Sequence, residues 1–547
     1  MERDSAVTAP WLGSRRYIAD VDSPSTAVPV VPPPPPRRRS RTPLLVGAAV
    51  LALALLAALL VGLNRGDDPA LEPGPAAAPL PPAAPATPVQ VGPSRALPAD
   101  FLGANGANVR ARRGTWSDPT FLSTLADLQP QNIRLFGGTT ANYWDWRAGG
   151  FVSGPGVPRE IAKYNNKDDG KDGEDDGTLS LETLAGAVKA GGSAPVYDLN
   201  MLTSTLEEQL AMLRAAKSLG LPVERVELGN EFYLDSGSNK LNVKVFPDGA
   251  AYGTEATRWI SAIKAEFPAA KVAVLGATSR NPAGTIGNNP RRNGWNASLL
   301  STVRGEDAVT FHNYFPTGLK PEQEIDSPAT AAAVTDAARL RLQQLRAEDL
   351  TDLPDGVEAW VTEWNLLDDT GRAQGRWVHG LAVAVYGAGL LAEPDVTLTD
   401  VHSLVGSIPT AAVYASGKVL SRLPGVAETA PANKPWDLSA TGVGMRPLWQ
   451  VVDGRDRVAA LTVADAPGVS GVVATGGRGG AAVFVNTADT PVTVAVPEGV
   501  AADAAVQQWS AAPGLLVAGD TGLTTVGGTV RGGRVELPPY SMTTLGA

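Results

Sequence analysis

The chain has 547 residues, of which 44% are hydrophobic, so it is long enough for about three domains and can bury a large core. It contains no cysteine, which excludes disulfides, thiolate metal sites and a cysteine nucleophile. The formal net charge is −10; residues 1–65 hold eight arginines against four acidic residues, a charge of +4, which leaves −14 for the remainder. An acidic main body argues against nucleic acids and long polyanions as ligands.

The N-terminal part of the chain predicts a membrane anchor. Residues 1–43 are polar and proline-rich, which is typical of a disordered tail. Residues 44–63 carry no charge, and twenty such residues span a bilayer. The arginines at 37–41 place the N-terminus in the cytoplasm and the rest of the chain outside, in a single-pass cell-membrane protein. A cleaved signal peptide is the alternative, although the apolar run is long for one. Residues 64–95, rich in Pro and Ala, are expected to form a stiff spacer.

Between residues 96 and 456, short apolar runs alternate with helical segments. The expected strands are 101–109, 132–136, 194–199, 226–231, 271–275, 308–311, 359–365 and 396–401. The expected helices are 118–128, 181–190, 206–219, 250–267, 296–303, 329–345, 376–391 and 445–452. Eight strands with intervening helices predict an α/β fold, a parallel (β/α)8 TIM barrel.

After residue 457 the helical periodicity ends. Short β-type runs follow at 458–463, 481–485, 491–496, 506–509 and 533–537, separated by Gly, Pro, Asp and Asn. They predict an antiparallel β-sandwich over 457–547. The segment 88–97, ahead of the barrel, is a candidate further strand of that sandwich.

Two of the expected barrel strands end in glutamate. Strand 226–231 ends in Gly229-Asn230-Glu231, and strand 359–365 carries Glu363 near its end. Active sites of such barrels lie at the C-terminal ends of the strands. Paired carboxylates there are what glycoside hydrolysis requires. Either glutamate alone could be a surface or helix-capping residue, but matching positions on two strands favour catalysis.

These strand ends resemble those of clan A glycoside hydrolases, which are retaining (β/α)8 enzymes. Their acid/base Glu follows an Asn after strand four, and their nucleophile Glu follows strand seven. Residues 132–139 (NIRLFGGT) resemble the Arg-containing Gly-Gly-Thr strand of heparanase-like, family 79 enzymes. Residues 362–365 (TEWN) are closer to xylosidase-like and arabinofuranosidase-like relatives. The resemblance covers about 100–456, and the sandwich resembles the usual companion domain.

The resemblance implies a role for each matching residue. Glu231 would be the acid/base and Glu363 the nucleophile, with their carboxyls about 5–5.5 Å apart. Asn230 would hydrogen-bond the sugar 2-hydroxyl. Arg134 would keep Glu363 ionised, and Tyr314 would donate to Glu363. The plainer alternatives are a structural ion pair for Arg134 and a barrel-rim aromatic for Tyr314.

Further polar and aromatic side chains near the strand ends are candidates for binding sugar. His312 is one of three histidines, and a core histidine is its alternative; His379, in an apolar helix, is expected to be structural. Aromatic rings can stack on a pyranose and amides can bind its hydroxyls. The aromatic candidates are Tyr233, Trp364, Trp144, Trp146 and Tyr143, and the amide candidates are Asn200, Asn105 and Asn108. Plain core is an equal alternative for Trp144 and Trp146.

The stretch from Asn165 to Gly177 (NNKDDGKDGEDDG) resembles a calcium loop in its spacing of acidic residues and glycines. A frame that starts at Asp172 puts Glu182 one place short of the bidentate position. A solvated acidic loop at the rim of the active site is therefore the better interpretation. No other metal or cofactor is expected.

The sequence thus predicts a membrane-anchored, outward-facing retaining glycoside hydrolase with a carbohydrate substrate. The heparanase-like strand suggests a β-glucuronidase-like exo-glycosidase; a β-xylosidase or an α-L-arabinofuranosidase is the alternative enzyme. A non-catalytic glycan-binding surface protein is the alternative of another class. The paired glutamates disfavour it, because a binding module needs no nucleophile.

Overall fold

The computed structural model describes residues 86–547, except 107–112, 155, 160, 162–178, 236–238, 279–288, 425 and 427–431. All described residues belong to the unit Pro85–Ala547. The expected tail at 1–43, the expected span at 44–63 and residues 64–85 of the expected spacer lie outside them. Within the described residues, no helix combines the length and the apolar character that crossing a bilayer requires.

Eight parallel strands close into a barrel, in the order β10-β12-β14-β3-β4-β7-β8-β9. This confirms the predicted barrel. Its strands are β3 (Leu102–Asn105), β4 (Asn132–Leu135), β7 (Ala194–Asp198), β8 (Arg225–Glu227), β9 (Lys271–Leu275), β10 (Ala308–His312), β12 (Glu358–Trp364) and β14 (Val396–His402).

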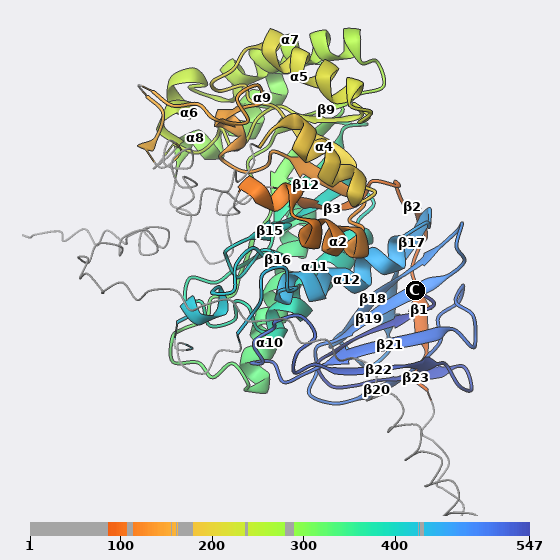
Figure 1. Ribbon diagram of the computed structural model, residues 1–547. Coiled ribbons are helices and arrows are strands. Elements are labelled where there is room, and N and C mark those ends of the chain that lie inside the picture. Colours follow the sequence, from red (N-terminus) through yellow and green to blue (C-terminus); the bar gives the residue numbers. More distant parts are fainter. Residues whose placement is uncertain are drawn as a thin grey trace, which may run out of the picture. The chain divides into compact units, whose positions relative to one another are not determined.

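Helices between the strands cover the barrel (Figure 1). They are α2 (Pro119–Leu128), α4 (Leu181–Ala190), α5 (Leu206–Ser218), α6 (Lys240–Val245), α7 (Gly249–Glu266), α8 (Pro290–Asn293), α9 (Trp295–Thr302), α10 (Pro328–Gln344), α11 (Trp377–Leu391) and α12 (Ala440–Val452). The start of α2 follows the sequence signal, because Asp118 accepts the N–H groups of Thr120 and Phe121 and Pro119 occupies the first turn. Helix α12 begins five residues earlier than predicted, since Ser439 caps it through the N–H of Gly442.

The interior of the barrel is apolar at one level and polar at the next. Five side chains from five strands form a separate apolar cluster: Val196, Ala273, Ala308, Trp360 and Leu398. Side chains alternate along a strand, so residues two positions further along point inward as well. On three of these strands they are Asp198, Thr362 and Asp400, and Arg134 of β4 and Glu227 of β8 contact this polar level; all five are buried.

Short elements follow several barrel strands. They are the pairs β5 (Trp144–Asp145) with β6 (Gly150–Phe151), β11 (Phe315–Pro316) with β13 (Leu366–Leu367) and β15 (Val405–Gly406) with β16 (Val413–Tyr414), and the single turns η1 (Arg113–Ser117), η2 (Ala141–Tyr143), η4 (Leu345–Asp349) and η5 (Leu420–Arg422). Because most of them lie in βα loops, they belong to the face of the barrel on which active sites form.

The C-terminal part forms an antiparallel sheet in the order β1-β17-β18-β19-β24-β21-β22, with β2 also paired to β17. The strands are β1 (Val89–Val91), β2 (Arg95–Ala96), β17 (Arg457–Val463), β18 (Val469–Thr475), β19 (Ala481–Asn486), β21 (Ala505–Ser510), β22 (Thr524–Thr529) and β24 (Ser541–Leu545). A separate pair, β20 (Val492–Ala495) with β23 (Arg534–Leu537), shares an apolar cluster with one face of this sheet.

Three strands of this part differ from the expectation. Strands β18 and β22 were not predicted, and the predicted strand 533–537 forms as β23 but is followed by a further strand, β24. Strand β22 (TTVGGT) has too little apolar character to stand out, and every residue of it is exposed. Strand β24 (SMTTL) is polar in composition, yet all five of its residues are buried between β19 and β21.

The opposite face of the sheet packs against α11 and α12, beside which the blue strands lie in Figure 1. Alternate residues of β19 divide between the two faces: Val483 belongs to the main core and Phe484 to the cluster with β20 and β23. The Nε1 of Trp377 in α11 donates to the carbonyl of Tyr540 at 2.7 Å. The main hydrophobic core therefore continues from the barrel helices into the sheet.

Candidate active site

The two predicted glutamates converge at the C-terminal end of the barrel. Glu363 lies in β12, and Glu231 follows β8. The Nδ1 of His312 lies 2.9 Å from Glu231 Oε1 and 3.6 Å from Glu363 Oε2. One oxygen of each carboxylate and one nitrogen of His312 all lie within 4.8 Å of one another. The side chain of Glu231 is 19% exposed and that of Glu363 is 6% exposed, so Glu231 is the more accessible carboxylate.

Arg134 contacts one carboxylate of this pair, Glu363, and the residue before the other, Asn230. Its Nη1 is 2.9 Å from Glu363 Oε1, and its Nη2 donates to Asn230 Oδ1 at 3.0 Å. The side chain is fully buried. Burial disfavours the charged guanidinium, but the charges of Glu227, Asp198 and Glu363 outweigh it and raise the pKa of Arg134. Arg134 is therefore a permanent cation that positions its neighbours and does not touch a substrate.

Glu363 is held in its ionised form. Its Oε1 accepts from Arg134 and from Asn105 Nδ2 at 3.2 Å, and its Oε2 accepts from the hydroxyl of Tyr314 at 2.7 Å. Burial alone would raise the pKa of Glu363, but His312, His402, Arg134 and the Tyr314 hydrogen bond lower it to about 2. Burial lowers the pKa of His402, whereas the pKa of His312 is raised, so His312, Arg134 and Tyr314 remain as the partners that stabilise ionised Glu363.

The backbone around Glu231 is unusual and is fixed from both sides. Gly229 has φ +91° and Glu231 has φ +50°, and a Cβ on Gly229 would lie 2.3 Å from the ring of Phe232. Asn142 clamps Asn230, because its Nδ2 donates to the carbonyl at 2.8 Å and its Oδ1 accepts the N–H at 3.0 Å. Left-handed backbone at a non-glycine residue persists only where its surroundings enforce it, as at functional sites.

Gly138 explains the Gly-Gly-Thr signature that follows β4. It has φ +80°, and a Cβ there would lie 3.8 Å from Glu363 Oε1 and 3.9 Å from His402 Nε2. Glycine at this position therefore leaves room for a ligand beside the nucleophile candidate.

Three buried polar atoms around the carboxylates have no hydrogen-bond partner among the described residues. They are Asn105 Oδ1, Asn230 Nδ2 and His312 Nε2. Buried polar atoms in proteins are almost always paired, so each exception requires an explanation. An acceptor and two ring or amide nitrogens, gathered around two carboxylates, are what the hydroxyls of a sugar would pair with.

Glu231, His312 and Glu363 also have the spacing of a metal-binding group. Their charges favour acid–base chemistry instead. Burial disfavours protonation of His312, but the two carboxylates outweigh it and raise its pKa, whereas a metal requires the neutral ring. Arg134 already compensates the charge of Glu363.

No protein-family model and no curated protein sequence matches this chain. Solved structures match its fold over 84% of its length. A family 51 arabinofuranosidase from Xanthomonas axonopodis pv. citri is 16% identical, with a TM-score of 0.58 and 99% of its own chain covered. A 4-O-α-L-rhamnosyl-β-D-glucuronidase from Fusarium oxysporum 12S is 14% identical, with a TM-score of 0.53 and 99% covered. A family 44 xyloglucanase from Paenibacillus polymyxa is 12% identical, with a TM-score of 0.53 and 98% covered.

The fold is that of the clan A glycoside hydrolases. In this clan A barrel, Glu231 and Glu363 occupy the strand ends that the resemblance assigned to them. Arg134 and Tyr314 hydrogen-bond Glu363, His312 bonds Glu231, and Asn230 bonds Arg134.

Three aromatic candidates of the clan A barrel do not lie where a sugar could stack on them. Trp364 is fully buried, with its ring 5.1 Å from that of Tyr386 in α11, because it points outward from β12 into the helix layer. Trp144 is 4% exposed and stacks on Phe136 at 5.4 Å. Tyr233 is 3% exposed; its hydroxyl donates to Glu231 Oε1 at 3.3 Å, so it orients the carboxylate.

The remaining candidates have structural partners or lie elsewhere. Asn200 is buried, and its Nδ2 donates to the carbonyl of Trp144 and to Thr203 Oγ1, so it shapes a loop and has no free donor for a ligand. His379 bonds Asn365 Oδ1 at 2.8 Å, and burial lowers its pKa to about 3, as expected of a structural histidine. Asn108 and the acidic stretch 165–177 lie outside the described residues.

Sequence reasoning missed Asn142 and His402. Asn142 lies in η2, where no strand or motif marks it. His402 ends β14, one residue beyond the predicted strand, and its ring contacts that of Tyr314. A histidine directly after the eighth strand was an available signal, whereas the position of Asn142 depends on the path of its loop.

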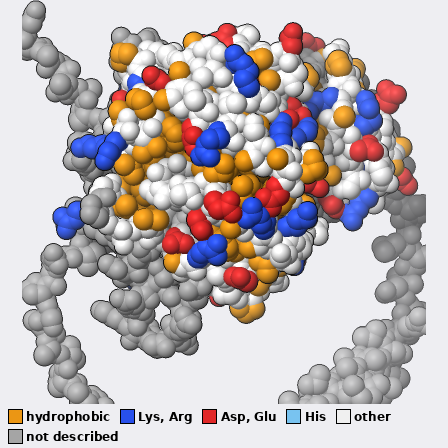
Figure 2. Space-filling view, turned by 90° about the horizontal axis from the view of Figure 1, so that it is seen from above, with side chains coloured by type: hydrophobic (Ala, Val, Ile, Leu, Met, Phe, Trp, Pro, Cys, Tyr) orange, Lys and Arg blue, Asp and Glu red, His pale blue; other side chains and the backbone are white. Residues whose placement is uncertain are grey.

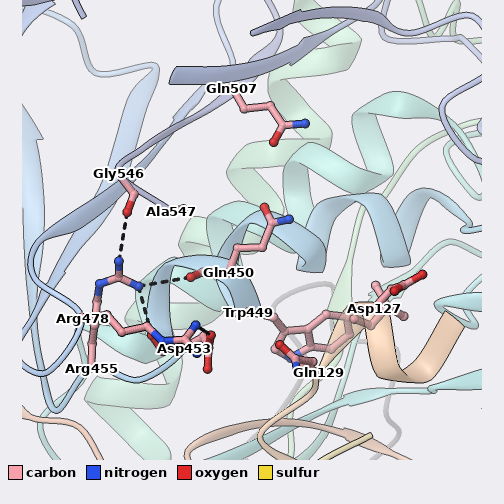
Figure 3. Close-up of a pocket in the computed structure, with 11 residues that line it drawn as sticks. Asp127, Gln129, Trp449, Gln450, Asp453, Arg455, Arg478, Gln507, Gly546 and Ala547 are labelled. Atoms are coloured by element: carbon pink, nitrogen blue, oxygen red, sulfur yellow. Dashed lines mark hydrogen bonds and ion pairs between the residues drawn. The ribbon is translucent and has the colours of Figure 1, made fainter. Parts of the chain in front are cut away.

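Two pockets lie outside the carboxylate pair. One of about 260 Å³ lies beside the loops after β4 and β7, lined by Trp146, Arg147, Asn200, Ser204 and Glu208 among others. The other, of about 420 Å³, lies at the end of α12 (Figure 3). Arg455 in this pocket donates to backbone carbonyls, including that of Gly546, and Arg478 forms an ion pair with Asp453. This second pocket lies between α12 and the sheet, and neither Glu231 nor Glu363 lines it.

Proposed function

We propose that this protein is a retaining glycoside hydrolase in which Glu363 is the nucleophile and Glu231 is the acid/base. The observation that carries the proposal is the approach of the two carboxylates to within 4.8 Å, on the two clan A strand ends. Retaining enzymes hold their carboxyls about 5–5.5 Å apart, whereas inverting enzymes need about 6.5–9.5 Å to admit a water molecule.

The geometry supports a division of labour between the two glutamates. Glu363, ionised with a pKa of about 2, attacks the anomeric carbon, while Glu231 protonates the departing glycosidic oxygen. Water then attacks the glycosyl-enzyme, and Glu231, now ionised, takes its proton. Asn230 Nδ2, which lacks a protein partner among the described residues, donates to the 2-hydroxyl of the sugar.

A β-glucuronide is the substrate class that one further observation favours. The guanidinium of Arg292 lies 5.3 Å from the ring centroid of Tyr233, whose hydroxyl bonds Glu231. Its Nη2 donates to the carbonyl and hydroxyl of Thr278, and it forms no ion pair with any described acidic residue. A cation one side chain away from the acid/base would pair with a uronate carboxylate. A β-xylosidase or α-L-arabinofuranosidase is the second candidate, and the similarity to a family 51 fold accommodates it.

A long anionic polymer fits poorly. The face seen in Figure 2 carries interspersed acidic and basic side chains without a continuous basic area among the described residues. This supports an exo-acting enzyme on a small or neutral glycan chain over one that grips a polyanion.

The proposal includes location: residues 44–63 anchor the enzyme in the cell membrane, with the barrel outside. The support is the twenty-residue uncharged run and the arginines before it. The full chain is expected in the membrane fraction after a high-salt wash, with its barrel accessible to protease added to intact cells. Recovery in the soluble fraction would contradict the anchor.

A panel of aryl glycosides tests the activity. It contains the β-glucuronide, β-xyloside, β-glucoside, β-galactoside and α-L-arabinofuranoside, offered to the full chain, to Glu363→Gln and to the surface control Glu322→Gln. Turnover of one member by wild type and control, with at least about a 1,000-fold loss in Glu363→Gln, is expected. A folded wild type that binds a glycan but hydrolyses no member, with Glu363→Gln binding equally, would instead support the glycan-binding alternative.

A further inference from the structure

Arg134 is the one described side chain that contacts both the candidate nucleophile and the residue expected to bind the 2-hydroxyl. Its Nη1 reaches Glu363 and its Nη2 reaches Asn230. The direction of these two bonds depends on what fixes the third side of the guanidinium. That side is Nε, which donates to Glu227 Oε2 at 2.5 Å.

Both carboxylate oxygens of Glu227 accept hydrogen bonds. The side chain is fully buried, and its second oxygen, Oε1, accepts the hydroxyl of Thr362 at 3.1 Å. Thr362 directly precedes Glu363 on β12. Glu227 therefore joins Arg134 on β4 to the strand that carries the nucleophile, across the barrel interior.

A guanidinium is a rigid, planar fork, so an anchor at Nε determines where both Nη atoms point. The other carboxyl beside Arg134 is less suited to this task. Asp198 Oδ2 lies 2.9 Å from Nη2, but neither oxygen of Asp198 makes a hydrogen bond to a described residue. Burial raises the pKa of Asp198 well above its usual value, and Arg134 opposes this only in part, so burial works against the charged form of this carboxyl.

We propose that Glu227 is the positioning residue of this site: by anchoring Arg134 at Nε, it aims one Nη at Glu363 and the other at Asn230. It thereby aligns the nucleophile and the 2-hydroxyl contact at once. The kinetic consequences rest on the proposed glycosidase function, whereas the alignment itself does not.

Two variants separate geometry from charge. Glu227→Gln keeps the length and an acceptor for Nε, and Thr362 can turn its hydroxyl to accept from the new amide. Glu227→Asp keeps the charge but withdraws the oxygens by one methylene. If Glu227 acts by position, Glu227→Asp loses about 100-fold in kcat, as a misplacement of about 1 Å does, and Glu227→Gln retains most of it. The reverse order would show a role in charge balance and overturn the proposal.

A substrate analogue tests the contact between Arg134 Nη2 and Asn230. The aryl 2-deoxyglycoside of the sugar that the panel identifies lacks the group that Asn230 contacts. In Glu227→Asp, the ratio of kcat/KM between the parent and the 2-deoxy substrate is expected to fall by about 10-fold or more. A purely structural role would lower both substrates equally and leave this ratio unchanged.

Asp400→Asn is the matched control. Asp400 is also buried inside the barrel, but its carboxyl oxygens make no hydrogen bond to any described residue. This variant should keep both kcat and the 2-deoxy ratio within about 3-fold of wild type.

Crystal structures of wild type and Glu227→Asp decide the alignment without any need for turnover. The expected result is that the Arg134–Glu363 contact, the Arg134–Asn230 contact or both open beyond 3.5 Å. Retention of both at their wild-type lengths overturns the proposal even in a protein without glycosidase activity. If the Arg134 contacts lengthen in Glu227→Asp and wild type hydrolyses no aryl glycoside of the panel, the alignment is established and the proposed function is refuted.

Discussion

Tyr314 shows how much of the chemistry depends on single hydrogen bonds. Its hydroxyl donates to Glu363 Oε2 at 2.7 Å and is among the groups that lower the pKa of Glu363 to about 2. Tyr314→Phe removes a donor to the ionised form, so the pKa of Glu363 rises. We expect the acidic limb of the kcat/KM profile to move up by about 1–2 pH units, which corresponds to the ~1.5–3 kcal/mol of a hydrogen bond to a charged group, whereas activity at pH 7 changes little because Glu363 stays ionised there.

The pH profile between pH 3 and 8 provides the measurement. An unchanged acidic limb in Tyr314→Phe would mean that Arg134 and His312 maintain the ionised state without it. Tyr386→Phe is a suitable control, because Tyr386 is a buried tyrosine of α11 whose hydroxyl makes no hydrogen bond to any described residue.

The effect of Asp400 on the stability of the folded protein depends on pH. Burial raises the pKa of its carboxyl well above the usual 3.8. The folded state keeps the proton while the unfolded chain releases it, so the folded protein loses stability as pH rises from about 3.8 toward the folded pKa. Asp400→Asn removes this loss. We expect denaturant unfolding to show the variant more stable than wild type at pH 8, with a smaller difference at pH 5. An equal difference at both pH values would contradict the raised pKa.

In strand β12, two residues two positions apart face opposite ways, because the register shifts between Val361 and Trp364. Thr362 points into the barrel toward Glu227, whereas Trp364 points into the helix layer against Tyr386. Trp364→Phe is therefore expected to lower the free energy of unfolding by about 1–2 kcal/mol, part of the ~3–5 kcal/mol that truncating a buried aromatic to alanine costs. KM should stay unchanged. A higher KM with unaltered stability would restore Trp364 as a sugar platform.

The strands explain why the sequence located the carboxylates but not the full site. Glu231 and Glu363 follow apolar runs, and that local pattern suffices to place them at strand ends. The face of a strand on which a residue lies is harder to read near an irregularity: β12 shifts register between Val361 and Trp364, which turns Trp364 away from the mouth. Asn142 could not be found at all, because its contact with Asn230 joins residues 88 apart in sequence.

At the scale of the whole molecule, barrel and sheet share one core. Almost every residue of α11 is buried, since one side faces the barrel and another faces β17, β18 and β19. A chain that stops at residue 456 would expose this helix and α12. We expect it to be insoluble, whereas the segment 86–547 is expected to melt in a single cooperative transition. A soluble 86–456 protein with cooperative melting would show that the sheet is dispensable.

The central position of β24 sets the order in which the molecule can be completed. The outermost strand β1 is made first, and β24 follows more than 400 residues later, yet β24 fills the place between β19 and β21. Until then both neighbours present open edges that can capture other extended chains. A chain cut short before residue 541 is thus expected to be prone to aggregate.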